Sequence, residues 1–213
     1  SGSGDGQFGI NGARSVLVDG SGNVWATDPS NQRIQKFSAA GPIATDVAGN
    51  LYVLDSTYGV IRKFDSSRNY IRSFASQGTG DGELSNPSAI VVDASGNMYV
   101  VDAGNYRIQK FDSNGNYLLK FGSQGTADGQ FTFGMPGDIA IAPSGDILVT
   151  DVIDGVSDRV QRFNSSGAFQ SKFTAIVASA ISPTAIAINQ VTGVIYIVDY
   201  GNIILKFDSS GNY

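Results

Sequence analysis

The sequence contains no cysteine and no histidine among its 213 residues. Without cysteine, the chain can form no disulfide, no thiolate nucleophile and no Cys-ligated metal centre. Without histidine, it cannot carry a Ser-His or Cys-His catalytic dyad, and it lacks the commonest zinc ligand. The most familiar kinds of hydrolytic and zinc-dependent active site are therefore excluded for this stretch of chain.

Charge is also scarce, since only 15% of the residues are charged and the formal net charge is -5. An acidic chain repels phosphate backbones and anionic membrane surfaces, so we do not expect a nucleic-acid partner. No apolar run approaches the roughly 20 residues that span a bilayer, so we expect no membrane insertion. The 27 glycines instead suit a chain of short strands and tight turns.

What is present is a repeat, which residues 87–122 show best. Apolar runs at 89–93, 98–102, 107–111 and 117–121 alternate with turns rich in Asp, Asn, Ser and Gly at 94–97 and 112–116. Short β-branched and aromatic runs between such turns are typical of hairpins. The unit predicts four strands, a, b, c and d, of one antiparallel meander.

An aspartate ends strand b in every copy of the unit, at Asp28, Asp55, Asp102, Asp151 and Asp199. A period of about 48 residues with four strands in each period indicates propeller blades. The strands are almost continuously apolar because stacked blades bury both faces of each sheet. We therefore predict an all-β fold, one β-propeller domain over residues 1–213 with five readable repeats. The approximate blades are 9–41 (truncated), 42–79, 80–126, 127–173 and 174–213 (truncated).

The interval from Asp28 to Asp55 is shorter than the others, and it lacks strand d of the first blade. The last residues stop where another strand d would begin, and residue 1 falls inside a repeat, which suggests a processed or excised segment. A closed ring normally joins strands from both termini. We therefore expect residues to be missing and a ring of six blades; a five-bladed ring with two truncated sheets, or strands supplied by another chain, are the alternatives.

Three motifs in register resemble the NHL-repeat family over essentially the whole chain. The first is a Gly-Asp-Gly-Gln-Phe loop at residues 4–8, with variants at 80–84 and 128–131; the others are an Asp-x-x-Gly-Asn hairpin and the strand Arg-Ile-Gln-Lys-Phe. The resemblance implies a propeller. The family includes RNA-binding domains of tripartite-motif proteins, sensor domains of bacterial kinases and the peptidylglycine amidating lyase, and fold alone does not choose among them. That lyase holds zinc with histidines and the RNA binders carry a basic face, so this acidic, histidine-free chain fits neither.

The five strand-b aspartates would share one rim of the ring. There they could bind a cation or a polyhydroxylated ligand, or cap their own b-to-c turns by accepting backbone N–H groups. We favour structural turn capping by Asp28, Asp55, Asp102, Asp151 and Asp199, because a feature of every blade is usually structural.

Arginine begins strand c in three copies, at Arg33, Arg107 and Arg159, whereas Val60 and Ile203 replace it in the others. These arginines could bind a phosphate or carboxylate, or pair with an aspartate or with loop carbonyls. A second basic residue precedes the last Phe of strand c in every copy, at Lys36, Lys63, Lys110, Arg162 and Lys206. Because a ring would spread these charges apart, we favour a role in which their side-chain stems lie over apolar surface rather than a role in binding nucleic acid.

Six hairpins begin with an aspartate, at Asp19, Asp46, Asp65, Asp93, Asp112 and Asp208. They lack the frame and the terminal bidentate acid of an EF-hand, so we interpret them as turns and predict no metal site or cofactor, with calcium left open.

The b-to-c loop of the fourth copy, residues 152–158, is longer than its counterparts and contains Asp154 and Asp158. Insertions on one face of a repeat array are common binding elements, although an exposed loop also drifts in length. Tyr58, Tyr106 and Tyr200 occupy nearby loop positions and offer flat, partly polar surfaces for sugars or peptides. With the three strand-c arginines, these five residues are the candidate ligand-binding positions.

Our leading hypothesis is a non-catalytic binding or structural module outside the cell or on its surface, which presents the b-to-c and d-to-a loops to a protein, peptide or glycan. The first alternative is a lyase or hydrolase that uses a metal bound by carboxylates at the channel mouth. The second is self-association through open blade edges into a ring or fibre. The sequence names no catalytic residue.

Overall fold

The computed structural model describes residues 16–18, 24–28, 33–35, 42–133, 137–153, 158–174, 183–199 and 203–213. In the first three ranges and at Asp199 it describes the backbone alone. Arg33, Asp28 and Asp199 therefore have a place in strands but no described side chain, and Asp154 and Tyr200 lie outside the described residues.

Three four-stranded antiparallel sheets form the middle of the chain. The second sheet has β4 (Ile43–Thr45), β5 (Leu51–Asp55), β6 (Val60–Phe64) and β7 (Tyr70–Phe74). The third has β10 (Ala89–Val92), β11 (Met98–Asp102), β12 (Arg107–Phe111) and β13 (Tyr117–Phe121). The fourth has β14 (Ile139–Ile141), β15 (Ile147–Asp151), β16 (Arg159–Phe163) and β17 (Phe169–Phe173). Each is the predicted meander of neighbouring strands.

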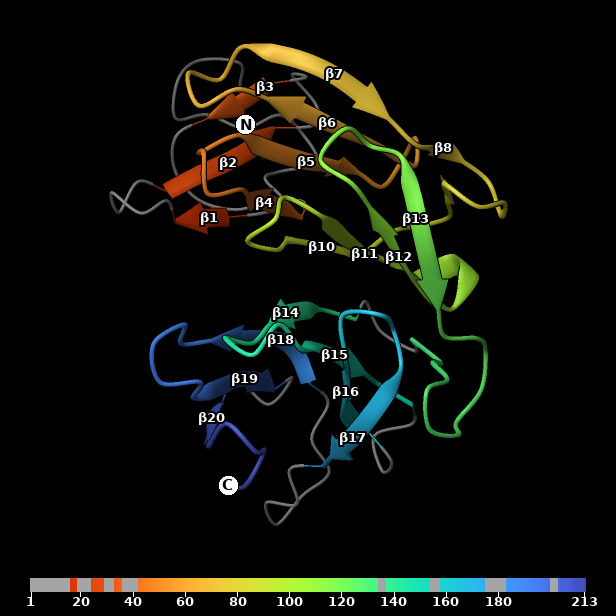
Figure 1. Cartoon of the computed structure of the whole chain (residues 1–213), viewed down its shortest axis with the longest axis vertical. Coiled ribbons are helices and arrows are strands. Elements are labelled where there is room, and N and C mark those ends of the chain that lie inside the picture. The colour runs from red at the N-terminus through yellow and green to blue at the C-terminus, as the bar shows by residue number, and fades with distance from the viewer. Residues whose placement is uncertain are drawn as a thin grey trace.

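Two three-stranded antiparallel sheets flank them. The first sheet has β1 (Val16–Val18), β2 (Val24–Asp28) and β3 (Arg33–Gln35), and the fifth has β18 (Pro183–Ile188), β19 (Ile195–Asp199) and β20 (Ile204–Phe207). The sheets follow one another in chain order along an arc, with β7, β13 and β17 on its outside (Figure 1). The first strands of consecutive sheets contact one another, β1 with β4, β4 with β10, β10 with β14 and β14 with β18. This arrangement confirms an all-β propeller of antiparallel blades.

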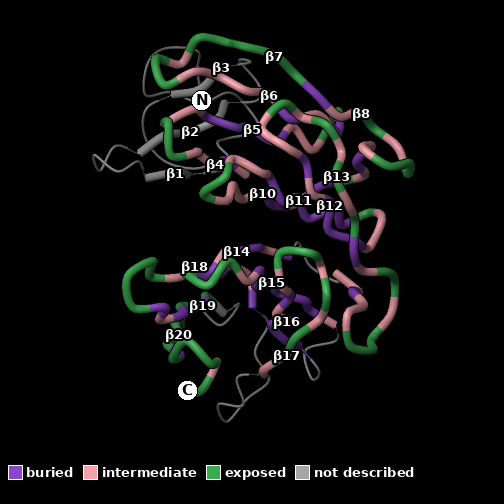
Figure 2. The backbone as a smooth tube through the Cα atoms, in the orientation of Figure 1, coloured by how far each residue is buried: buried purple, intermediate pink, exposed green. Residues whose placement is uncertain are grey.

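The inner strands of the middle sheets are buried on both faces, as the apolar runs predicted, whereas the outer strands are largely exposed. Every residue of β11 and β15 is buried, and Figure 2 shows the interior strands as the buried part of the tube. Between the third and fourth sheets, Tyr99, Val101 and Ile108 pack against Ile147 and Val149. No helix in the described residues is long and apolar enough to cross a membrane.

The c-to-d hairpins join each sheet to the one before it. In the third sheet, Gly115 has φ +85°, and a Cβ atom there would lie 2.3 Å from the ring of Phe74 in the second sheet. Gly167 meets Phe121 and Gly211 meets Phe173 in the same way. Glycine is thus required both for the left-handed backbone and for the close approach of the preceding sheet.

The basic residue near the end of strand c makes a second connection between sheets, in the forward direction. Lys63 donates to the carbonyl oxygen of Ser113 at 3.0 Å, Lys110 to that of Ser165 at 3.4 Å, and Arg162 to that of Ser209. Each acceptor belongs to the c-to-d hairpin of the next sheet. These charges are therefore distributed between blades and form no patch.

Candidate functional site

The loops that enter each blade and those that join strands b and c share one face of the propeller, which we call the loop face. Here a buried polar cluster recurs in the third and fourth sheets. Asp102 is fully buried at the end of β11, and its carboxylate accepts the backbone N–H of Ser85 at 2.7 Å and the Nε of Arg107 at 2.7 Å. Gln109 and Asn105 also donate to it. Charged groups this deeply buried must be paired in this way.

Arg107 and Gln109 extend from this aspartate to the loop that precedes the blade. Arg107 donates to the carbonyl oxygens of Gly80 and Glu83, and Gln109 donates to that of Glu83 while it accepts the N–H of Gly82. Within the same loop, β8 (Ser76–Gln77) pairs in parallel with β9 (Glu83–Leu84). Two buried side chains thus satisfy the backbone of an irregular loop that has few partners of its own.

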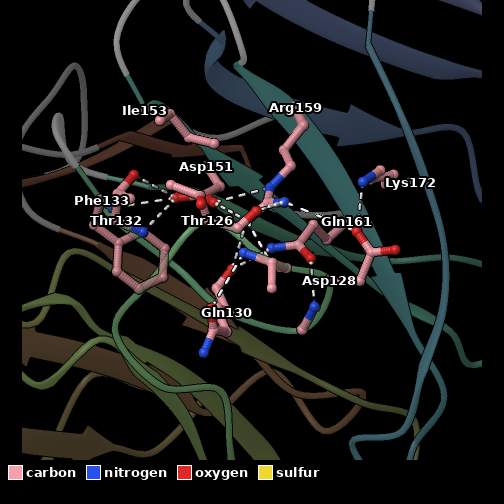
Figure 3. Close-up of polar contacts among 12 residues, drawn as sticks. Thr126, Asp128, Gln130, Thr132, Phe133, Asp151, Ile153, Arg159, Gln161 and Lys172 are labelled. Carbon is pink, nitrogen blue, oxygen red and sulfur yellow. Dashed lines mark hydrogen bonds and ion pairs between the residues drawn. The ribbon is translucent and has the colours of Figure 1, made fainter.

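The fourth sheet repeats the cluster around Asp151, which is also fully buried (Figure 3). One carboxylate oxygen accepts the N–H groups of Thr132 and Phe133, and the other accepts Nε of Arg159 at 3.1 Å and Nη2 at 3.0 Å. Arg159 also donates to three loop carbonyl oxygens, those of Thr126, Ala127 and Gln130. Gln161 donates to the last of these and accepts the N–H of Gly129.

The tips of both loops are exposed and carry one ion pair each. Asp81 pairs with Lys120 of β13, and Asp128 pairs with Lys172 of β17 (Figure 3), with all four side chains 46–49% exposed. The hydrogen bond from Lys120 holds the pKa of Asp81 below its ordinary value. A polar, accessible rim therefore stands on loops whose inner side is fixed.

The sequence before the second sheet contains no such Gly- and Asp-rich loop, and the cluster of the second sheet is different. Val60 stands where the other two sheets have arginine, and Arg62, two residues further along β6, pairs with Asp55 instead. Asp55 also accepts the N–H groups of Thr57 and Tyr58, which lie in its own b-to-c turn. Only here do we find the turn-capping contacts that the sequence led us to expect among the described aspartates. At Asp102 and Asp151 the backbone donors come from the preceding loop, because that loop crosses the end of strand b.

The other predicted ligand-binding residues occupy different environments. Tyr58 is 64% exposed on the loop face. Tyr106 is partly buried in a left-handed conformation after the short 3-10 helix η2 (Ala103–Asn105). Asp158 is buried and accepts the N–H of Ile153 at 2.7 Å. Arg107 and Arg159 each bind their own loop, and the structure does not bring them together.

Sequence reasoning missed Asp138, which lies directly before β14 and takes the place of Ala89 in the third sheet. Its carboxylate accepts the N–H of Ile139 at 2.8 Å and that of Ile186, in the neighbouring sheet, at 2.9 Å. Burial raises its pKa above the ordinary value. Alignment of the copies could have found it, because an acid stands there in a position that is uncharged in the other copies, as Ser15, Pro42, Ala89 and Ala185.

A hollow lies on the face opposite the loop face, beside the a-to-b hairpins. It has a volume of about 540 Å³ and is lined by residues of three sheets, among them Val91, Tyr99, Ile141, Ile186 and Gln190. Its lining is mostly aliphatic. In the described part of the chain, no group of three or more His, Cys, Asp or Glu is placed to hold a metal ion.

Comparison with known proteins gives a repeat motif and a fold. Residues 84–111 match the NHL repeat. Two structures of virginiamycin B lyase from Staphylococcus aureus, a catalytically inactive variant with quinupristin and a selenomethionine-substituted form, superpose with TM-scores of 0.61 and 0.60. They are 16% and 15% identical to this chain, over 92% of its length and 70% and 69% of theirs.

A streptogramin B lyase structure gives a TM-score of 0.53 at 12% identity, over 92% of this chain and 83% of that one. Such identities establish likeness of fold and nothing finer. A search of curated proteins found no match.

Proposed function

We propose that this chain, an NHL-repeat β-propeller, is a non-catalytic binding module that presents its loop face to a protein, peptide or glycan. The observation that carries the proposal is the recurrence of one buried cluster, Asp-Arg-Gln, beneath two loops with exposed tips. Fixing a loop from below lowers the conformational entropy lost when a ligand binds to its tip.

The chemistry of the loop face favours a neutral or polar partner. Asp81 and Asp128 are paired with lysines, so their charges are balanced. Tyr58 adds an exposed aromatic ring in the b-to-c turn of the second sheet. Aromatic rings beside hydrogen-bonding groups suit sugars and peptides. Low charge and abundant Gly, Ser, Asn and Thr favour a location outside the cell or on its surface.

The experiment is a glycan and peptide array probed with the wild type and with matched variants. Asp81→Asn and Tyr58→Ala alter the loop face, whereas Val191→Ser alters an exposed residue of the opposite face, 92% accessible. We expect the first two to weaken binding about tenfold or more, and the third to have no effect. Binding that responds only to Val191→Ser, or chemical turnover of the bound ligand, would contradict the proposal.

A lyase is the second candidate, supported by the likeness in fold to virginiamycin B lyase. That enzyme is catalytically inactive when a histidine is replaced by alanine. These 213 residues contain no histidine, so the same group is not available here. Chromatography of quinupristin after incubation with the protein, with and without added divalent metal, tests the alternative, and unchanged quinupristin would remove it.

We also propose that the two three-stranded sheets count as blades, which makes five repeats. One further sheet between the fifth and the first would make a ring of six. The fifth sheet supports this idea, because one of its faces is apolar and uncovered. Sedimentation and scattering measurements of mass and shape would test it.

A further inference from the structure

The uncovered face of the fifth sheet repeats a face that is buried elsewhere in the molecule. In the third sheet, Tyr99, Val101 and Ile108 are 1%, 0% and 0% exposed, because the fourth sheet packs on them. The same register positions in the fifth sheet hold Tyr196, Val198 and Ile204, which are 38%, 40% and 70% exposed. Tyrosine, valine and isoleucine recur in the same order.

The other middle sheets follow the same rule on this face. The second sheet places Tyr52, Leu54 and Ile61 there, and all are at most 3% exposed. The opposite face of the fifth sheet is covered, since Ile186, Ile195, Ile197 and Leu205 pack with the fourth sheet. In the second and third sheets, residues of these types are covered by the next sheet. Among the described residues, one face of the fifth sheet has no such cover.

The basic residue of strand c recurs in the fifth sheet together with these apolar residues. Lys63, Lys110 and Arg162 each bind a hairpin carbonyl of the next sheet, and Lys63 and Lys110 also lie over Tyr52 and Tyr99, at 5.0 and 4.8 Å from the ring centres. Lys206 is their counterpart beside Tyr196. It is exposed, and within the described part of the chain it has no hydrogen-bond or ion-pair partner.

We propose that a second copy of this chain docks on this face, which we define as Tyr196, Val198, Ile204 and Lys206, and that it does so through its first sheet. The contact continues the interface that joins consecutive sheets within one chain. At the register positions of Ile139, Ile147 and Val149, which receive the third sheet, the first sheet has the apolar residues Val16, Val24 and Ala26. A backbone carbonyl of the second copy supplies the acceptor for Lys206.

This contact joins two different surfaces, so it is heterologous and produces a closed ring of copies or a filament. It uses the face of the sheet and not the hydrogen-bonding edge of an open strand. It does not depend on the binding role of the loop face, and it is an alternative to a sixth sheet within one ring, because either would cover the same face of the fifth sheet.

Sedimentation velocity over a wide range of protein concentration tests the proposal. We expect the mass to rise above that of the monomer with concentration. Ile204→Glu should weaken association roughly 100-fold, because it would bury an unpaired charge, and Lys206→Met roughly tenfold, by removing a charged hydrogen bond. Val191→Glu, at a residue 92% exposed in the a-to-b hairpin of the same sheet, is the matched control and should have no effect.

The absence of cysteine allows a second, independent measurement. An Ile204→Cys variant should react with a thiol reagent quickly in dilute solution and more slowly as its concentration rises. A monomer at every concentration overturns the proposal, as does association that Ile204→Glu leaves unchanged. Slow labelling in a dilute monomer overturns it too, since the first sheet of the same copy would then cover the face.

Discussion

The second sheet and the two sheets that follow it are built from one repeat, yet they differ wherever a neighbouring segment differs. The third and fourth sheets are entered by Gly- and Asp-rich loops, and each has an Arg-x-Gln pair in strand c that binds the loop carbonyls. The sequence before the second sheet contains no such loop motif, and strand c of this sheet has Val60 and Arg62 instead. The residues of strand c therefore depend on the loop that packs against them, and not on the blade alone.

The c-to-d hairpins give the same lesson at a different contact. Gly115 and Gly167 receive a phenylalanine from the fourth strand of the preceding sheet. In the described residues the first sheet has three strands, and in the c-to-d hairpin of the second sheet the glycine is replaced by Arg68, at φ 72°. Its side chain donates to the carbonyl oxygens of Gly49 and Ser66. Two separate positions of the second sheet thus depart from the repeat where the interval between Asp28 and Asp55 is short.

The largest difference in stability that we expect between the two kinds of sheet comes from the buried cluster. Arg159→Ala leaves Asp151 fully buried without its cation and removes one donor from each of three loop carbonyls, so we expect a loss of about 3–5 kcal/mol in the free energy of unfolding. The equivalent change Arg62→Ala affects a side chain that is 38% exposed, and should cost about 1 kcal/mol or less. Urea denaturation measures both, and equal losses would show that the two sheets use their arginines alike.

The hairpin glycines offer the next largest effect. Gly167→Ala places a Cβ atom 2.5 Å from the ring of Phe121 at φ +83°, and overpacking together with backbone strain should cost about 2–4 kcal/mol. Arg68→Gly, at the position without a phenylalanine to receive, should change stability by about 1 kcal/mol or less. A large loss for Arg68→Gly would mean that its hydrogen bonds, and not the missing contact, explain the substitution.

A smaller effect comes from exchanging one arrangement for the other. Arg107→Val combined with Gln109→Arg gives the third sheet the residues of the second, and we expect the new arginine to keep the pair with Asp102. The carbonyls of Gly80 and Glu83 lose donors, so the variant should be about 1–2 kcal/mol less stable than the wild type, and more stable than Arg107→Val alone. Hydrogen exchange should rise in residues 78–85 and remain unchanged in residues 125–132.

The sequence predicted the architecture well because the apolar runs and turn motifs repeat in register. The four-stranded meanders, the Asp-first hairpins and the NHL resemblance all follow from local spacing. The partners of Asp102 and Asp151 did not follow, because the donors come from the preceding loop, about 18 residues away in sequence. The strand-c lysines bond to the next blade, and this role could not be predicted without the relative positions of two sheets. Asp138 belongs to no repeated motif, because it stands where a single copy departs from the others.

The smallest expected effect is a dependence on pH that separates two otherwise equivalent hairpins. In the third sheet, Asp112 accepts the N–H groups of Asn114 and Asn116, and the side-chain hydrogen bond from Asn116 lowers its pKa below 3.8. A carboxyl whose pKa falls on folding adds stability above its unfolded pKa, and that stability is lost as the pH drops through the folded value. In the fourth sheet, Asn164 makes the same turn contacts with an amide oxygen that does not titrate. Asp112→Asn should therefore reduce the difference between urea midpoints measured at about pH 5 and about pH 3, and Asn164→Asp should enlarge it. If both variants keep the wild-type difference, the acid sensitivity comes from other carboxylates, and the two hairpins do not differ in this respect.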